Sequence, residues 1–148
     1  MIERFQQFTV LVTKLNRSIR RLKTEETEEF NLKSPHVSCL HYIYRFGELT
    51  LKQLCDVCEE DKASVSRSVE FLKANGFVEQ SLSVNKKYKS PLTLTEKGFV
   101  VAKKLSDKID EILAQATEGI SEEDRAIMYK CLNIISERLD NLSASGEK

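Results

Sequence analysis

Hydrophobic residues recur at alternating steps of three and four over the first 24 residues. This spacing places apolar side chains on one face of an α-helix, and it predicts one long amphipathic helix over residues 3–24. The apolar row is narrow and regular, which indicates that it packs against a partner helix. The row consists of Phe5, Phe8, Val12, Leu15, Ile19 and Leu22.

Three shorter helices are predicted between this helix and residue 76. Ser34 followed by Pro35 is typical of an N-cap and a first helical position, and Gly47 is expected to end that helix. Two further helical patterns cover residues 51–58 and 62–75, and Gly76 follows the second in the position where a left-handed residue ends a helix. These signals predict a short helix, a turn and a second short helix.

The pattern changes to alternation after residue 76. Residues 77–82 and 88–94 are predicted to form two strands of a hairpin whose tip, residues 83–87, is basic. Pro91 has no N–H to donate to a neighbouring strand, so the second strand is expected to lie at a sheet edge or to bend there.

Two long helices are predicted to complete the chain. Thr95 is expected to cap the first, and Ser121 with Asp124 three residues later begins the second. The fold class predicted is mainly α with a small β-hairpin wing, a winged helix-turn-helix with flanking helices. The apolar row of the last helix, expected to face inward, is Ile127, Cys131, Ile134, Ile135, Leu139 and Leu142.

Composition is that of an ordinary globular domain, with 41% hydrophobic and 31% charged residues among 148. No run approaches the ~18 uninterrupted apolar residues that a membrane helix needs, so no membrane partner is expected and the predicted location is cytoplasmic. Neither a domain linker nor a repeat is visible, which predicts a single domain over residues 1–148.

The formal net charge is zero, with 23 basic and 23 acidic side chains. The charges are unevenly distributed. Residues 1–24 carry +5, residues 25–60 carry −5, residues 61–90 carry +3 and the remainder carries −3. Neutrality therefore does not exclude a nucleic-acid partner, although a local excess of charge is by itself a weak indication of phosphate contact.

The helix over residues 62–75 has the pattern of a DNA-recognition helix. Its inward positions are apolar, and the first half of its outward face carries small, polar and basic side chains that suit phosphates and base edges. An alternative for Arg67 is a surface ion pair with Glu70 or Glu59. The candidate DNA-binding residues here are Lys62, Ala63, Ser64, Ser66 and Arg67.

Four segments resemble, in the right order, the signatures of the MarR (multiple antibiotic resistance regulator) family. They are residues 49–55, 63–72, 75–79 and 92–98. The resemblance covers nearly the whole chain once the flanking helices are included. It implies a homodimeric transcriptional regulator, expected to be a repressor, that binds a pseudo-palindromic operator in double-stranded DNA.

The same resemblance implies that different parts of the chain have different functions. Residues 48–95 would form the winged helix-turn-helix lobe, and residues 1–24 and 96–142 a helical dimerisation region. The wing departs from the family pattern, because Lys86, Lys87 and Lys89 stand where an arginine usually reaches the minor groove. A lysine lacks the planar guanidinium, so these three residues are expected to bind phosphates.

A small-molecule effector would, by the family pattern, bind between the dimer helices and the DNA-binding lobe. Candidate lining residues are His41, Tyr42, Tyr44 and Phe46, although core packing explains them equally well. The alternative function is a winged-helix protein-interaction module without sequence-specific DNA binding.

No catalytic or cofactor signature is visible. The chain has two histidines and no Gly-rich phosphate loop, so an enzyme is not expected, nor a cofactor. His36 and His41 are not spaced to share a helix face, which favours solvated or capping histidines over metal ligands. Cys55 and Cys58 have CxxC spacing, but the resemblance to the MarR family implies that they fall at core positions of the supporting helix. Cys39, near a helix N-terminus, is the one candidate for an exposed reactive thiol.

Overall fold

The computed structural model describes residues 2–81 and 89–144, and for residue 2 the backbone alone. By its contacts the chain divides into two compact units, Met1–Glu111 and Ile112–Lys148. The first unit contains the N-terminal helix, the shorter helices, the strands and residues 96–111 of the long helix that follows them. The second contains the end of that helix and the last helix.

The N-terminal helix is continuous from residue 2 to residue 25, as its apolar period predicts. It consists of α1 (Ile2–Arg4), a π-helical stretch η1 (Phe5–Val10) and α2 (Leu11–Glu25). The short 3-10 helix η2 (Glu28–Phe30) follows it. Large side chains of its apolar row remain exposed within one chain, among them Phe5 at 66% and Leu15 at 54%.

Three helices then build the lobe, α3 (Ser34–Phe46), α4 (Leu51–Val57) and α5 (Lys62–Ala74). The start of α3 differs by one residue from the prediction, because Lys33 rather than Ser34 is the N-cap. The Lys33 N–H donates to Nδ1 of His36 at 3.0 Å, so a histidine side chain caps the helix in place of the serine hydroxyl. Gly47 and Gly76, at φ of 83° and 78°, end α3 and α5 as predicted.

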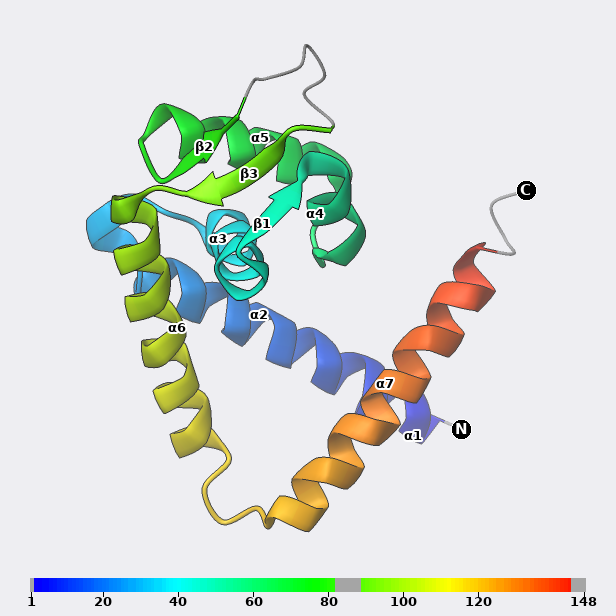
Figure 1. The fold of residues 1–148 in the computed structure, drawn as a ribbon. Helices are drawn as coiled ribbons and strands as arrows, with labels where there is room; N and C mark the ends of the chain where they lie inside the picture. The colour runs from blue at the N-terminus through cyan, green and yellow to red at the C-terminus, as the bar shows by residue number, and fades with distance from the viewer. Residues whose placement is uncertain (1, 82–88, 145–148) are drawn as a thin grey trace. The chain divides into compact units, whose positions relative to one another are not determined.

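A small antiparallel sheet completes the lobe (Figure 1). Its strands are β1 (Glu48–Thr50), β2 (Val78–Gln80) and β3 (Pro91–Leu94), in the order β1-β3-β2. The hairpin of β2 and β3 is confirmed. The expectation that the Pro91 strand lies at an edge is wrong, because β3 pairs on both sides. Pro91 is tolerated as the first residue of β3, opposite Thr50 at the end of the ladder.

The core lies where α3, α5 and the sheet meet. Leu40 and Ile43 of α3 contribute to it at 1% and 0% exposure, as do Leu72 of α5 and Leu92 of β3 at 0%. These side chains belong to one buried cluster that fixes α5 against the rest of the lobe. Burying each large aliphatic side chain contributes about 1.5–3 kcal/mol.

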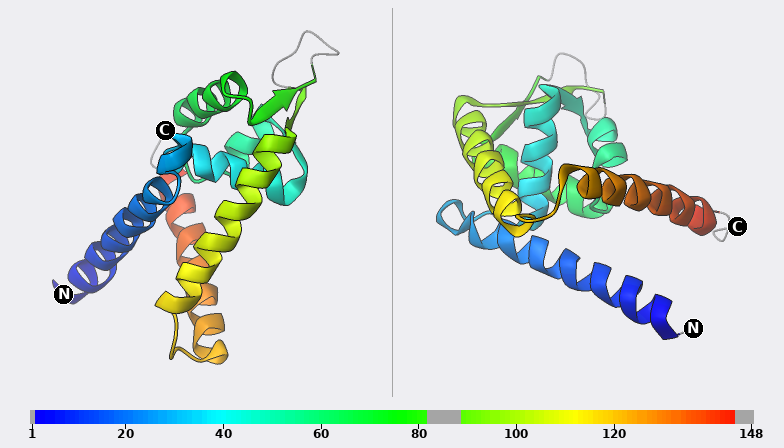
Figure 2. Two further views of the ribbon diagram at one scale, coloured as in Figure 1. Left: turned by 90° about the vertical axis from the view of Figure 1, so that its left-hand side faces the viewer. Right: turned by 90° about the horizontal axis from the view of Figure 1, so that it is seen from below.

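Two long helices end the chain, α6 (Glu96–Ala116) and α7 (Glu122–Ala144). Thr95 Oγ1 accepts from the Gly98 N–H at 3.0 Å, and Ser121 Oγ accepts from the Asp124 N–H at 3.1 Å, so both predicted caps are confirmed. Figure 2 shows each helix from two further sides. No helix among the described residues has the length and apolar character needed to cross a bilayer.

The last helix corrects one prediction. The apolar row of α7 was expected to face inward, but no residue of α7 is buried. Ile127 is 54% exposed, Leu139 53% and Leu142 69%. Within one chain, most of this row is therefore exposed.

Candidate nucleic-acid interface

The recognition helix α5 begins at a well-formed cap. Asp61 has extended backbone, at φ −69° and ψ 160°, and its Oδ1 accepts from the Ser64 N–H at 2.7 Å. The carboxylate satisfies a free N–H of the first turn and opposes the positive end of the helix dipole. The cap therefore fixes the residue at which the outward face of α5 begins.

The preceding helix is capped reciprocally. The Gln53 N–H donates to Thr50 Oγ1 at 3.1 Å, and the Thr50 N–H donates to Gln53 Oε1 at 2.9 Å. Leu54 of α4 is fully buried, and so is Val65 of α5. The inner faces of both helices are thus held in the core, which leaves the outer face of α5 available to meet a ligand.

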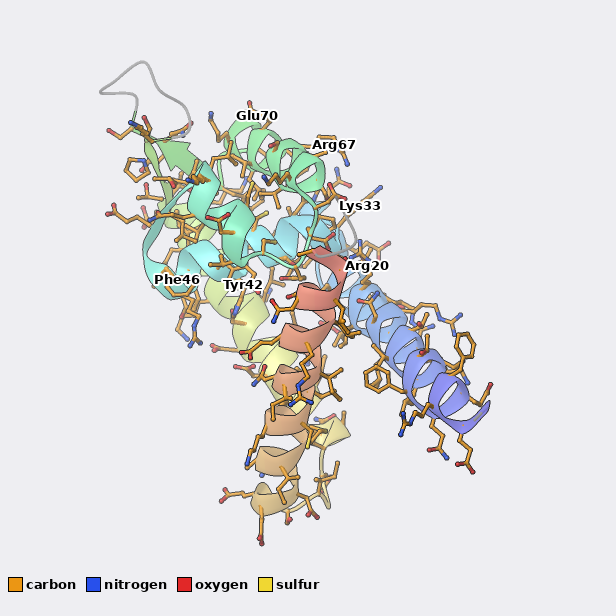
Figure 3. The ribbon with its side chains drawn as sticks, turned by 90° about the vertical axis from the view of Figure 1, so that its right-hand side faces the viewer. Arg20, Lys33, Tyr42, Phe46, Arg67 and Glu70 are labelled. Atoms are coloured by element: carbon orange, nitrogen blue, oxygen red, sulfur yellow. The ribbon has the colours of Figure 1, made fainter. Side chains whose placement is uncertain are left out.

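The outer face of α5 carries the side chains predicted for DNA contact. Lys62, Ala63 and Arg67 are exposed, and Ser64 and Ser66 are half-buried at the flanks of the inward face. Figure 3 shows Arg67 on the outer side of the helix. The structure brings these five residues together on one helical surface.

The alternative partners of Arg67 are engaged elsewhere. Glu70 pairs with Lys73 at 3.6 Å, and Glu59 pairs with Lys23 at 3.3 Å. Among the described residues Arg67 forms no salt bridge, so the N–H groups of its guanidinium are available to an external acceptor.

The wing is only partly described. Lys86 and Lys87 lie outside the described residues, and Lys89 is exposed two residues before β3. The bases of the two strands are paired, with Val78 opposite Leu94.

An aromatic stack joins α5 to the start of α3. The Phe71 ring lies 4.2 Å from the His36 ring, centroid to centroid, with 9° between their planes. The stack accounts for the bulky aromatic side chain at this position of α5. Burial and the charge of Lys33 lower the pKa of His36.

Ion pairs connect α2 to the turn before α5. Arg20 Nη1 lies 2.6 Å from Glu60 Oε1, and Glu59 accepts hydrogen bonds from Lys23 and from Ser38. Burial alone would raise the pKa of Glu59, but hydrogen bonds from Ser38 and the backbone, the charge of Lys23 and a hydrogen bond from Tyr42 hold it at about 2. These ion pairs and hydrogen bonds therefore connect the long N-terminal helix to the turn that precedes the recognition helix.

The four predicted effector residues lie on different sides of α3. Tyr42 faces Glu59, and burial and that hydrogen bond raise its pKa to about 12. Tyr44 packs on Phe99 of α6 at 5.4 Å, and Phe46 is 53% exposed at the end of the helix. His41 is exposed, with its ring 5.4 Å from that of Tyr42.

Among these four residues the rings of His41 and Tyr42 contact each other, whereas Tyr44 contacts Phe99 of α6. A hollow of about 700 Å³ elsewhere in the same unit includes none of them. It is lined by Glu25, Glu26, Glu28, Glu29, Lys104, Leu105, Asp107, Lys108 and Glu111.

The cysteines depart from the sequence interpretation. Cys39 is fully buried rather than exposed. Its thiol donates to the sulfur of Cys58, and this bond, together with burial, raises its pKa, which disfavours the reactive thiolate form. The same bond lowers the pKa of Cys58. All four cysteines are free, and no group of three potential metal ligands occurs within the described residues.

These features define the class of the protein: a winged helix-turn-helix protein whose recognition helix presents an exposed arginine. Residues 30–87 match the model of the MarR family. The resemblance carried by the sequence motifs is thus confirmed over this stretch, and the fold of the whole chain is that of MarR-family transcriptional regulators.

Solved structures share this fold at low sequence identity. A MarR-family regulator from Listeria monocytogenes, solved with a 26mer DNA, is 21% identical with a TM-score of 0.84, covering 95% of each chain. One from Neisseria meningitidis is 16% identical with a TM-score of 0.80, covering 97% of this chain and 99% of its own.

The organohalide-sensing regulator RdhR-CbdbA1625, solved with 2,4-dichlorophenol, is 22% identical with a TM-score of 0.77. It covers 90% of this chain and 79% of its own. No curated protein matches the chain.

Proposed function

We propose that the protein is a sequence-specific DNA-binding transcriptional regulator that acts as a homodimeric repressor on a pseudo-palindromic operator. The observation that carries this proposal is the outer face of α5, where Lys62, Ala63 and Arg67 are exposed on a helix held by a cap and a buried core. The similar Listeria regulator was solved with DNA, which supports the same ligand here.

Each side chain of α5 has a distinct role in this proposal. Arg67 makes a bidentate contact to a guanine in the major groove, and Ala63 packs on a thymine methyl group. Lys62, Ser64 and Ser66 bind phosphates and set the orientation of the helix. In the wing, Lys86, Lys87 and Lys89 contact the backbone beside the same half-site.

Dimerisation accounts for the exposed apolar rows. Leu15 on the N-terminal helix is 54% exposed and Leu139 on α7 is 53% exposed, each within a regular helical row. Contiguous apolar rows of this kind mark interaction sites. We assign residues 1–24 and 96–142 to the dimer region and residues 48–95 to the DNA-binding lobe of a single functional domain.

Effector control follows from the link between these regions. A ligand that shifts the N-terminal helix would move the turn of Glu59 and Glu60, because Lys23 and Arg20 bind these carboxylates. Half-sites lie about one helical turn apart, so a small change in the spacing of two recognition helices weakens simultaneous binding. We retain His41, Tyr42, Tyr44 and Phe46 as candidate ligand contacts.

The decisive experiment selects bound sites from a random duplex pool with the purified protein. The expected result is a palindrome with half-sites spaced by one helical turn. The Arg67→Ala variant should lose about 1–3 kcal/mol of binding at one guanine position and tolerate other bases there. The matched control is Arg45→Ala, which removes an exposed arginine from the far end of α3 and should bind as wild type.

Two outcomes contradict the proposal. Absence of duplex binding even at low salt would favour a winged-helix module that binds another protein. Unchanged specificity of Arg67→Ala would show that this arginine does not contact a base.

A further inference from the structure

The first residue of α3 carries an unsatisfied polar group. Ser34 is 3% exposed, and its buried hydroxyl forms no hydrogen bond with any described residue. Buried hydroxyl groups without partners are uncommon, since each loses its bonds to water without replacement. A hydroxyl without a partner at a helix N-terminus therefore indicates that its acceptor comes from outside the chain.

Backbone donors at the same helix end are also free. The Lys33 N–H is taken by His36, and the Val37 N–H bonds to the Lys33 carbonyl at 3.1 Å. Pro35 has no N–H. The N–H groups of Ser34 and His36 remain without an acceptor among the described residues. With the dipole of a 13-residue helix behind them, they favour a negatively charged group.

A hollow of about 630 Å³ opens beside this helix end, and it is basic. Three of its lining residues are cations and one is a carboxylate. Arg20 is held by Glu60, and Arg21 lies 3.9 Å from Glu25 in a loose, exposed pair. Lys33 forms no salt bridge within the described part of the chain. The lining consists of Arg20, Arg21, Thr24, Glu25, Lys33, Ser34 and Pro35.

The first turn of α3, which lines the hollow, contacts the recognition helix. His36, two residues after Ser34, stacks on Phe71 of α5, and Arg67 lies one helical turn before Phe71 on the same face. Figure 3 shows Lys33 and Arg67 on the same side of the lobe. A duplex held by Arg67 would therefore bring its backbone close to the start of α3.

We infer that the N-terminus of α3 is a phosphate-binding site, formed by the free N–H groups of Ser34 and His36, the Ser34 hydroxyl and the Lys33 ammonium. Arg20 and Arg21 supply positive charge at its rim. The phosphate comes either from the duplex backbone, outside the segment read by α5 and the wing, or from free inorganic phosphate. The duplex source rests on the proposed function, whereas the free-phosphate source does not.

The first test uses the protein without DNA. Inorganic phosphate is titrated into ¹⁵N-labelled protein at constant ionic strength, and amide shifts are followed by NMR. A free-phosphate site predicts saturable shifts at Ser34 and His36 that disappear in Lys33→Gln and Ser34→Ala. The control variant Lys103→Gln removes an exposed lysine of α6 and should shift as wild type.

The second test measures duplex affinity as a function of salt. Each phosphate bound by a cationic side chain adds about −0.9 to the slope of log K against log salt. If Lys33 binds a backbone phosphate, Lys33→Gln should reduce the magnitude of the slope by about 0.9 per protomer, with no change in base preference. Lys103→Gln should keep the wild-type slope.

Ser34→Ala also separates binding from folding. The variant removes an unpaired hydroxyl, so its melting temperature without phosphate should equal or exceed that of the wild type. A lower melting temperature would show that the hydroxyl is satisfied within the chain and would overturn its assigned role.

The results distinguish this inference from the proposed function. Saturable amide shifts support the free-phosphate source, and a reduced slope without such shifts supports the duplex source. Wild-type behaviour of Lys33→Gln in both measurements overturns the site. If the wild type binds no duplex, the proposed function fails, and the phosphate titration alone decides the site.

Discussion

Gly98 stands in the first turn of α6, directly against the backbone of Phe77. A Cβ added at Gly98 would lie 1.9 Å from the Phe77 carbonyl oxygen and 2.8 Å from its carbonyl carbon. Real Cβ atoms essentially never approach closer than 3.0 Å, so Gly98→Ala requires the two segments to separate by roughly 1 Å. Both contacted atoms belong to the backbone, and no rotamer change relieves the clash.

This separation would disturb the start of the wing. The Thr95 N–H donates to the same Phe77 oxygen at 3.1 Å, and the Lys97 ammonium lies 4.3 Å from the centre of the Phe77 ring. Overpacking typically costs about 1–3 kcal/mol, and a backbone clash belongs at the upper end. Alanine recovers about 1 kcal/mol through its higher helix propensity. We expect a net loss of about 2 kcal/mol in the free energy of unfolding.

Urea unfolding followed by far-UV circular dichroism measures this loss. The midpoint should fall at unchanged m value, and Tm should fall by about 4–8 °C at roughly 2–4 °C per kcal/mol. The control is Gln115→Ala, an exposed α6 position where the change should stay within about 0.5 kcal/mol. A Gly98→Ala variant as stable as the wild type would show that helix propensity outweighs the clash and would refute this reasoning.

Three further predictions concern the cap, the histidine and the thiols. Asp61→Ala should lower stability by about 1 kcal/mol in urea melts through loss of the α5 cap, and Asp61→Asn should retain it; equal losses would contradict a capping role. Because the folded-state pKa of His36 lies below 6.5, stability should be complete above that pH and fall as the pH drops through it. His36→Phe keeps an aromatic ring for stacking but cannot be protonated, so it should lose less stability at low pH than the wild type. Thermal melts at a series of pH values measure this difference, and a pH profile equal to that of the wild type would contradict the role of His36. Under native alkylation with iodoacetamide, mass spectrometry should find exposed Cys131 modified well before buried Cys39, and equal rates would disprove the burial.

Most of the helices could be predicted from local sequence signals. Caps such as Thr95 and Ser121, the stop at Gly76 and the three-four apolar period act within a few residues, so they can be recognised without the fold. The recognition helix was predicted for the same reason. Its candidate residues fall on one outward surface, because helical spacing alone decides which side chains share a face.

Pairing across the chain could not be predicted in this way. The three-residue strand β1 has no alternation long enough to detect, yet it gives β3 a second neighbour and places Pro91 in a central strand. The capping role of His36, its stack on Phe71 and the contact of Cys39 with Cys58 join residues whose proximity depends on how α3 packs. The basic hollow at Ser34 was missed because its cations come from separate segments, α2 and the residue before α3.

The sequence by itself determined the order of the elements, the recognition helix and the apolar rows of the N-terminal helix and α7, since each depends on periodicity and caps over short distances. Only the tertiary structure decided which groups meet. It left the guanidinium of Arg67 exposed, bound Glu59 and Glu60 to α2, buried Cys39 and left the Ser34 hydroxyl without an acceptor among the described residues. Such outcomes depend on distances between segments remote in sequence, and those distances are set by the packing of the shared core.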